Sequence, residues 1–176
     1  MQKTESKIKK TAELEDICRQ LRKEGRAIVT CNGCFDIIHA GHVRFFHEAK
    51  NQGDVLIVAI NSDASVRRIK GSARPINCQE DRCRVVAALG CVDYVTVFDE
   101  DDPREILSVI RPAVHANGEE YGEECIEAEV VKKNGGRIHL IRKIGGLSTS
   151  GLLKMLSADA AKSQAGGGNK HCCNDN

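Results

Sequence analysis

The chain has 176 residues, of which 41% are hydrophobic and only 3% aromatic, so one domain with a core of Ile, Val, Leu and Ala is expected. Its 26 basic and 25 acidic residues give a net charge of +1, which favours neither nucleic acid nor an anionic membrane as a partner. No apolar run approaches the ~20 residues that span a bilayer, and the polar N-terminus lacks the apolar segment of a signal peptide. We therefore expect a cytoplasmic protein.

Apolar periodicity predicts helices and strands that alternate along the chain. The expected elements, in chain order, are a helix at 7–24, a strand at 27–31, a helix at 41–51, a strand at 54–60, helices at 63–69 and 79–89, a strand at 94–98, a helix starting at 102–103, a strand at 113–116, a helix at 123–133, a strand at 137–141 and a helix at 148–156.

This alternation is typical of a Rossmann-like α/β fold, an open parallel five-stranded sheet with helices on both faces. The run at 54–60 is almost continuously apolar, which fits a parallel strand covered on both sides. We expect an N-terminal helix within 1–26 to pack on a domain at 27–156. The tail at 157–176 has no periodicity and is expected to be disordered.

The most informative segment, Asn32–His42, follows the first strand and reads N-G-C-F-D-I-I-H-A-G-H. A Gly-containing turn from a strand into a helix N-terminus is suited to binding a phosphate. If the helix begins near residue 40, His39 and His42 lie on one side of its first turn, and Gly41 lets a phosphate approach the backbone. Such donors suit nucleotidyl transfer, in which the α-phosphate gains negative charge as an oxygen attacks it in line.

This motif resembles that of the cytidylyltransferase-like nucleotidyltransferases, and the resemblance covers about residues 15–156. Within that family the chain is similar to the heptose 1-phosphate adenylyltransferase branch, which forms the second half of the bifunctional heptose enzyme of lipopolysaccharide synthesis. The segments that carry this closer similarity follow one another in the same order: Asn61–Asp63, Lys70–Gly71, Arg74–Ile76, Glu80–Arg82, Cys91–Asp93 and Gly146–Ser150.

The resemblance implies roles for individual residues. The catalytic residues, which hold the α- and β-phosphates and neutralise their charge, would be His39, His42 and Lys70. The second substrate would contact Asp63 and, through its phosphate, Arg82. The nucleotide ligands would be Cys34, Phe35, Asp36, Gly41, Asn117, Glu120, Ser148, Thr149 and Ser150.

The resemblance also implies an activity, adenylyl transfer from ATP to a heptose 1-phosphate, with an ADP-sugar and pyrophosphate as products. Mg²⁺ is expected to arrive with the triphosphate, because it usually keeps waters and binds substrate phosphates. No cluster of protein metal ligands is visible in the sequence. A homodimer is expected, since enzymes of this family commonly pair.

Residues 117–121 depart from the Lys-Gly-Gly-Asp-Tyr of the heptose branch, since Asn117 replaces the lysine and the segment is more acidic. CTP therefore stays open as the nucleotide, with glycerol 3-phosphate or a phospho-amino-alcohol as the second substrate, and so does an FMN adenylyltransferase. A nucleotide-binding regulator without turnover is the alternative from another class. Cys31 and Cys34, two of nine cysteines, have the Cys-x-x-Cys spacing of thiol-redox proteins.

Overall fold

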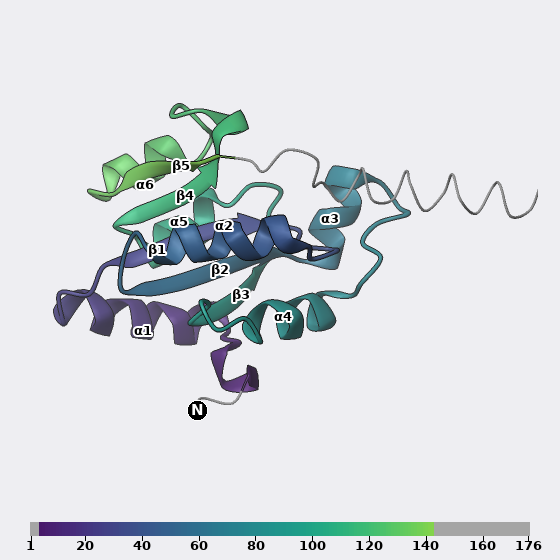
Figure 1. Cartoon of the computed structure of the whole chain (residues 1–176), viewed down its shortest axis with the longest axis horizontal. Coiled ribbons are helices and arrows are strands. Elements are labelled where there is room, and N and C mark those ends of the chain that lie inside the picture. The colour runs from purple at the N-terminus through teal and green to yellow at the C-terminus, as the bar shows by residue number, and fades with distance from the viewer. Residues whose placement is uncertain (1–3, 143–176) are drawn as a thin grey trace, which may run out of the picture.

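The computed structural model describes residues 4–142, and its centre is one sheet of five parallel strands with helices on both faces (Figure 1). The strand order is β3-β2-β1-β4-β5, so the sheet grows outward from β1 in both directions. This is the fold that the sequence predicts. The strands are β1 (Ile28–Gly33), β2 (Val55–Asn61), β3 (Tyr94–Phe98), β4 (Val114–Gly118) and β5 (Arg137–Ile141).

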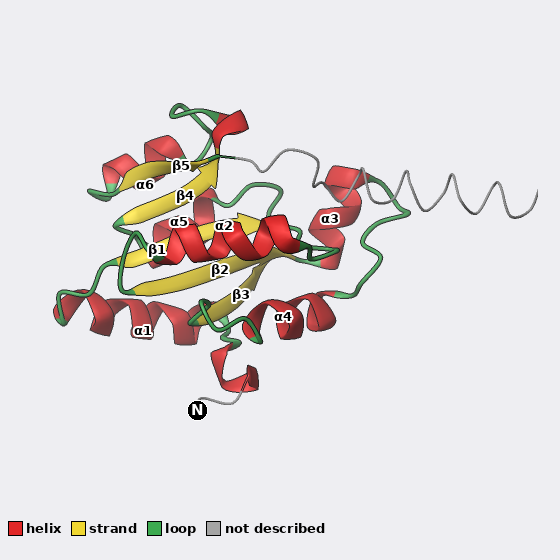
Figure 2. Cartoon of the chain, in the orientation of Figure 1, coloured by secondary structure: helices red, strands yellow, loops and turns green. Residues whose placement is uncertain are grey.

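The helices divide between the two faces and the edges of the sheet (Figure 2). α2 and α4 pack on one face, α1 and α5 on the other, and α6 lies against β5 beside α5. Their bounds, with those of two short 3₁₀ helices, are η1 (Thr4–Lys7), α1 (Thr11–Lys23), α2 (Ala40–Lys50), α3 (Asp63–Lys70), α4 (Gln79–Ala87), α5 (Arg104–Ile110), η2 (Glu119–Tyr121) and α6 (Ala128–Lys133).

The apolar run of β2 fits its place in the middle of the sheet, where both of its faces are covered. All seven of its residues are buried, and alternate side chains enter opposite layers of the core. Leu56, Val58 and Ile60 pack beneath α2 and α4, whereas Val55 and Ile57 pack against α1 and α5. Successive side chains of a strand point to opposite faces of the sheet. A strand with both faces covered is therefore apolar along nearly its whole length.

Two predicted helices begin several residues later than expected. The helix expected at 7–24 begins only at Thr11, because the segment before it runs along the edge of the sheet: Ile8 forms a parallel bridge with Val95, and the Lys9 amide donates to the Val95 carbonyl at 2.8 Å. This contact covers the exposed edge of β3. The helix expected at 123–133 begins only at Ala128, since residues 123–127 form turns instead of a helix. The helix expected at 148–156 and the tail lie outside the described residues.

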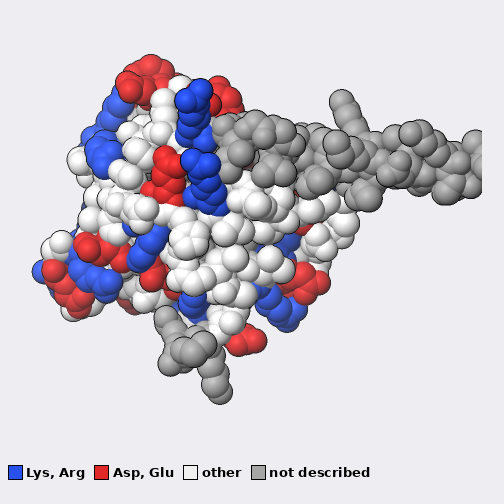
Figure 3. Space-filling view, viewed as in Figure 1, with Lys and Arg blue, Asp and Glu red and all other residues white. Residues whose placement is uncertain are grey.

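On the face in view, side chains of both charges lie close to one another, beside a broad area without charged residues (Figure 3). None of the helices within residues 4–142 combines the length and apolarity needed to cross a bilayer.

A buried polar pair joins β1 to β4 inside the sheet. Thr30 and His115 are register partners on these strands, both are fully buried, and the Thr30 hydroxyl lies 2.8 Å from His115 Nδ1. His115 Nε2 has no hydrogen-bond partner among the described residues. Burial therefore lowers the pKa of His115 to about 4, and the imidazole is neutral in the folded protein.

This neutral histidine should make stability depend on pH in a definite direction. The unfolded chain binds a proton at His115 below about pH 6.5 whereas the folded chain does not until about pH 4, so its contribution is complete above pH 6.5 and is lost as the pH falls. Between pH 7 and pH 5 the loss from this group should be about 2 kcal/mol. Urea unfolding of the wild type and of a Thr30→Val, His115→Leu variant at both pH values measures it. An equal fall in both proteins would contradict the assignment.

Candidate active site

The loop after β1 lies at the carboxyl edge of the sheet and turns sharply through Gly33 and Phe35. Phe35 has a positive φ of +45°, which bulky L-residues rarely adopt. Its ring is held between Phe46, at a centroid distance of 4.9 Å, and His42, at 5.6 Å. Gly33 lies close beneath this ring, since a Cβ there would approach the Phe35 ring to 3.1 Å and require it to shift slightly. Packing of the ring thus stabilises a strained turn and supports His42 from below.

His39 and His42 form a reciprocal cap at the N-terminus of α2. The Gly41 amide donates to His39 Nδ1 at 3.1 Å, and the His39 amide donates to His42 Nδ1 at 3.4 Å. The two rings stack with a centroid distance of 3.9 Å. Because both Nδ1 atoms accept backbone N–H groups, the proton of each neutral imidazole resides on Nε2. The helix end therefore presents two imidazole N–H donors beside its own backbone amides.

The charge state of His42 suits a hydrogen-bond donor rather than a cation. Burial is the main cause that lowers the pKa of His42 to about 4, and the repulsion that a proton on His39 or the Lys70 ammonium would exert on a second charge adds to it. Lys70 is exposed at the last position of α3 and lies close enough to His42 for its ammonium group to act on the pKa of that ring. The predicted trio of His39, His42 and Lys70 is therefore brought together in the structure.

Asp36 was expected to contact the nucleotide, but the structure uses its carboxylate to anchor another loop. The side chain is 2% exposed and pairs with Arg74 at 2.6 Å. It also accepts the backbone amides of Ile76 and Asn77, both at 2.9 Å, while Asn77 Nδ2 donates to the Asp36 carbonyl at 2.5 Å. With its oxygens occupied in this way, Asp36 fixes the 74–77 loop against the turn after β1.

Arg82, expected to bind the phosphate of the second substrate, has a side chain that is buried among the loops of the site. Its side chain is fully buried, and its guanidinium donates to three separate segments: the Asp63 carboxylate at 2.7 Å, the Cys34 carbonyl at 2.5 Å and the Asn77 carbonyl at 3.1 Å. Asp63, likewise expected at the second substrate, is the partner of this pair. Arg82 is therefore placed to position the site's loops, and its contact with a substrate phosphate stays a prediction.

Asn117 and Glu120 lie together at the end of β4 and in η2. Asn117 Oδ1 accepts the Gly118 amide at 3.0 Å, and Asn117 Nδ2 donates to Glu127 at 3.3 Å. Glu127 is buried, whereas Glu120 is exposed beside Gly118. The rim where the base and sugar were expected is thus acidic, and Asn117 is oriented by a carboxylate that the sequence did not single out.

Cys31 and Cys34 do not form a reactive pair. Cys31 is fully buried, and burial raises its pKa above that of an ordinary thiol, which disfavours the reactive thiolate. Cys34 is half-buried, with its sulfur 3.8 Å from Asn61 Oδ1. Within residues 4–142, no three His, Cys, Asp or Glu side chains are grouped so that they could hold a metal ion.

Ser148, Thr149 and Ser150 lie outside the described residues. The structure adds three residues that sequence reasoning did not assign to the site, Arg74, Asn77 and Glu127. Arg74 belonged to a segment that matched the heptose branch, so a signal for it existed. Asn77 and Glu127 act through contacts between segments distant in sequence, and no local pattern marks them.

Comparison with known proteins agrees with this geometry. A family model described as cytidylyltransferase-like matches residues 30–144. The bifunctional protein HldE of Wolinella succinogenes is 49% identical over 144 residues, which cover 81% of this chain and 30% of the relative. The chain thus spans about a third of the length of the curated relatives it matches.

Solved structures show the same fold. A lipopolysaccharide core biosynthesis protein from Thermoplasma volcanium aligns with a TM-score of 0.55 and 29% identity, over 68% of this chain and 98% of that one. A pantoate-beta-alanine ligase from Francisella tularensis aligns with a TM-score of 0.60 over 90% of this chain and 76% of that one, and at 16% identity the likeness concerns the fold alone. Since the family model covers most of the described domain, from β1 to the end of β5, the chain belongs to the cytidylyltransferase-like family.

Proposed function

We propose that this chain is a nucleotidyltransferase that moves the adenylyl group of ATP onto a heptose 1-phosphate, releasing pyrophosphate. The observation that carries the proposal is the stacked pair His39 and His42 at the N-terminus of α2, whose Nδ1 atoms both accept backbone amides. Their Nε2–H groups, at the positive end of the α2 dipole, would receive the α- and β-phosphates of the nucleotide.

The reaction needs charge stabilisation more than proton transfer. The attacking phosphate oxygen of the sugar 1-phosphate is already anionic, so no strong general base is required. As it approaches the α-phosphorus in line, negative charge grows on the non-bridging oxygens. His42, neutral because of its low pKa, would donate a hydrogen bond to them, and Lys70 would add positive charge from the end of α3. Preorganised donors of this kind contribute on the order of 2.7–4 kcal/mol each.

Mg²⁺ is part of the proposal as a companion of the triphosphate. The carboxylate nearest the turn, Asp36, is engaged by Arg74 and two backbone amides. A protein-built cage is thus not formed by the described residues, and the ion would be held mainly by phosphate oxygens and water, as is usual for Mg²⁺. There it would neutralise part of the charge of the leaving pyrophosphate.

The choice of substrates rests on the relatives. Those at 40–49% identity are named bifunctional protein HldE, this chain matches about a third of their length, and we assign the adenylyl transfer to this part. The structural neighbour from Thermoplasma volcanium, named for lipopolysaccharide core biosynthesis, supports a sugar phosphate. The acidic rim at Asn117 and Glu120 differs from the heptose branch, so base and sugar are the parts of the proposal that most need a direct test.

Pyrophosphate release with Mg²⁺ provides that test, with ATP and CTP each combined with heptose 1-phosphate and glycerol 3-phosphate. We expect turnover with ATP and heptose 1-phosphate only. Turnover with CTP or glycerol 3-phosphate would keep the phosphate chemistry but refute the substrate assignment. Nucleotide binding without turnover in all four mixtures would favour a regulator.

Replacing His42 tests the phosphate donor. His42→Ala should lower kcat on the order of 10²–10³-fold with the fold intact, because it removes a preorganised donor. His42→Gln, which keeps a neutral N–H donor, should retain more activity than the alanine variant. His47→Ala is the matched control, since His47 is exposed in the last turn of the same helix. Near-normal turnover in His42→Ala would refute the role of this residue.

Arg82→Lys tests whether Arg82 positions the loops or binds the substrate. A lysine keeps the charge but cannot reach the Asp63, Cys34 and Asn77 acceptors together. The displaced Cys34 loop should lower kcat and raise the KM for ATP, by up to ~10²-fold in kcat/KM, since displacements of ~1 Å have such effects.

Asp63→Asn should shift the same parameters in the same direction, because it weakens the same buried pair. Steady-state kinetics with each substrate varied in turn separates the two roles. A rise confined to the KM for the sugar phosphate would show that Arg82 binds that substrate directly.

A further inference from the structure

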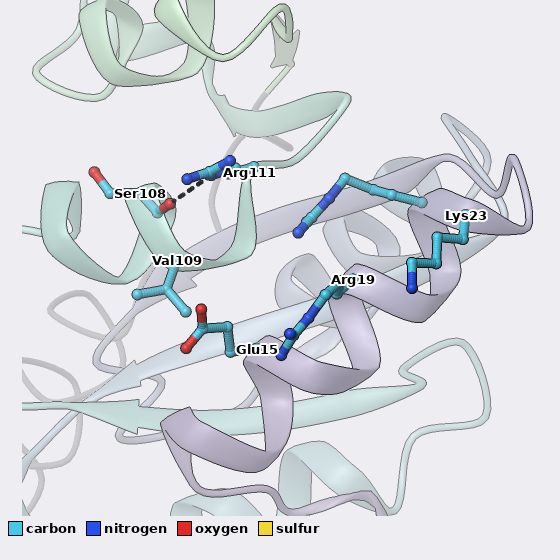
Figure 4. A pocket seen from close by; sticks show the side chains of 7 residues that line it. Glu15, Arg19, Lys23, Ser108, Val109 and Arg111 are labelled. Carbon is cyan, nitrogen blue, oxygen red and sulfur yellow. Dashed lines mark hydrogen bonds between the residues drawn. The ribbon is translucent and has the colours of Figure 1, made fainter.

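A hollow lined by basic side chains lies between α1 and α5, away from the proposed catalytic loop (Figure 4). Its volume is about 670 Å³, within the range of small-ligand sites. Its lining comprises Glu15, Arg19, Arg22, Lys23, Ser108, Val109 and Arg111. Four basic side chains thus face one acidic one, in a chain whose net charge is only +1.

The hollow lies at the amino edge of the sheet. α1 ends at Lys23, just before β1 begins, and α5 ends at Ile110, just before β4 begins. The proposed phosphate loop follows the carboxyl end of β1, at the opposite edge. The basic hollow is therefore a separate place on the molecule, and an inference about it does not rest on the proposed catalytic function.

Arg111 occupies a backbone conformation that disfavours it. It caps the C-terminus of α5 with φ +50° and ψ +66°, in the left-handed region. Among the described residues, four other helices end next to a residue with positive φ, and each of these is a glycine, the residue that this geometry favours. They are Gly25 after α1, Gly71 after α3, Gly122 after η2 and Gly135 after α6. At the end of α5 the residue with positive φ is Arg111, which brings a guanidinium to the hollow at the expense of backbone strain.

The cations are only partly used by the protein. One N–H group of Arg22 donates to the Ile110 carbonyl at 2.5 Å, and the Nε–H group of Arg111 donates to the Ser108 carbonyl at 3.3 Å. Arg19 pairs with Asp16. Lys23 has no hydrogen bond or ion pair with any residue in 4–142. Helix dipoles favour a cation at each helix end singly, but they do not explain several cations facing one hollow, where their charges repel.

We propose that this hollow is a second anion site, which binds a small molecule carrying at least two phosphate groups. Arg22, Lys23 and Arg111 would contact the phosphates, since their remaining donors come from both sides of the hollow. A single phosphate could not engage both helices with equal effect, because the basic groups are distributed over α1 and the end of α5 (Figure 4).

The test uses inorganic tripolyphosphate as the probe, measured by isothermal titration calorimetry without Mg²⁺. A His42→Ala, Lys70→Ala variant serves as the background, because it weakens binding at the proposed catalytic loop. We expect tripolyphosphate to bind this variant with one site, and inorganic phosphate to bind at least tenfold more weakly. Equal affinity for the two probes would overturn the requirement for two phosphate groups.

Arg111→Gly, added to the same background, separates ligand binding from stability. Glycine suits the left-handed backbone, so the melting temperature should stay the same or rise while the affinity for tripolyphosphate falls at least tenfold. Lys23→Glu should lower the affinity for tripolyphosphate further. Arg84→Gln, which removes an exposed arginine from α4 on the other face, is the control and should have little effect. An unchanged affinity in Arg111→Gly and Lys23→Glu, or an equal loss in Arg84→Gln, would overturn the proposal.

Discussion

The candidate active site depends on two buried charged side chains that tie three loops together at one edge of the sheet. Asp36, just after the turn that follows β1, accepts the backbone of the 74–77 loop and pairs with Arg74. Arg82 from α4 returns to the same turn through the Cys34 carbonyl and to α3 through Asp63. A buried ion pair is costly to break from one side, because the remaining charge has no partner. These contacts therefore hold the turn, and with it His39 and His42, in one geometry.

The electrostatic character of the site follows from that rigidity. The stacked imidazoles are partly buried at a helix N-terminus, and burial together with nearby positive charge keeps His42 neutral. A neutral Nε2–H can stabilise charge that develops on a phosphate without having to lose or gain a proton. The helix end adds oriented amides, and Lys70 adds the formal charge. Positioning and preorganised dipoles, rather than acid–base chemistry, are what this arrangement offers.

The sequence was sufficient for the parts of the structure that depend on local pattern. The apolar run of β2 predicted a central parallel strand, and the spacing of His39 and His42 predicted their proximity in the first turn of α2. It was not sufficient where the outcome depends on distant segments. The residues near Arg82 in the sequence do not indicate that the Asn77 and Cys34 carbonyls turn toward it, so its contacts between loops were not predicted. Likewise, Ile8 satisfied a helical pattern but pairs with Val95 on β3.

We infer that His39 and His42 present Nε2–H groups to the phosphates of a nucleotide, and that His42 does so as a neutral imidazole. Histidine-ring ¹⁵N chemical shifts, measured by NMR at pH 7 with and without ATP and Mg²⁺, test it most directly. We expect both rings to be Nε2–H tautomers in the free protein. The Nε2 resonances of both should shift when ATP is added, whereas the Nε2 resonance of the buried His115 should not. Protonated rings in the free protein, or Nε2 resonances that do not shift when ATP is added, would contradict the role of the two histidines.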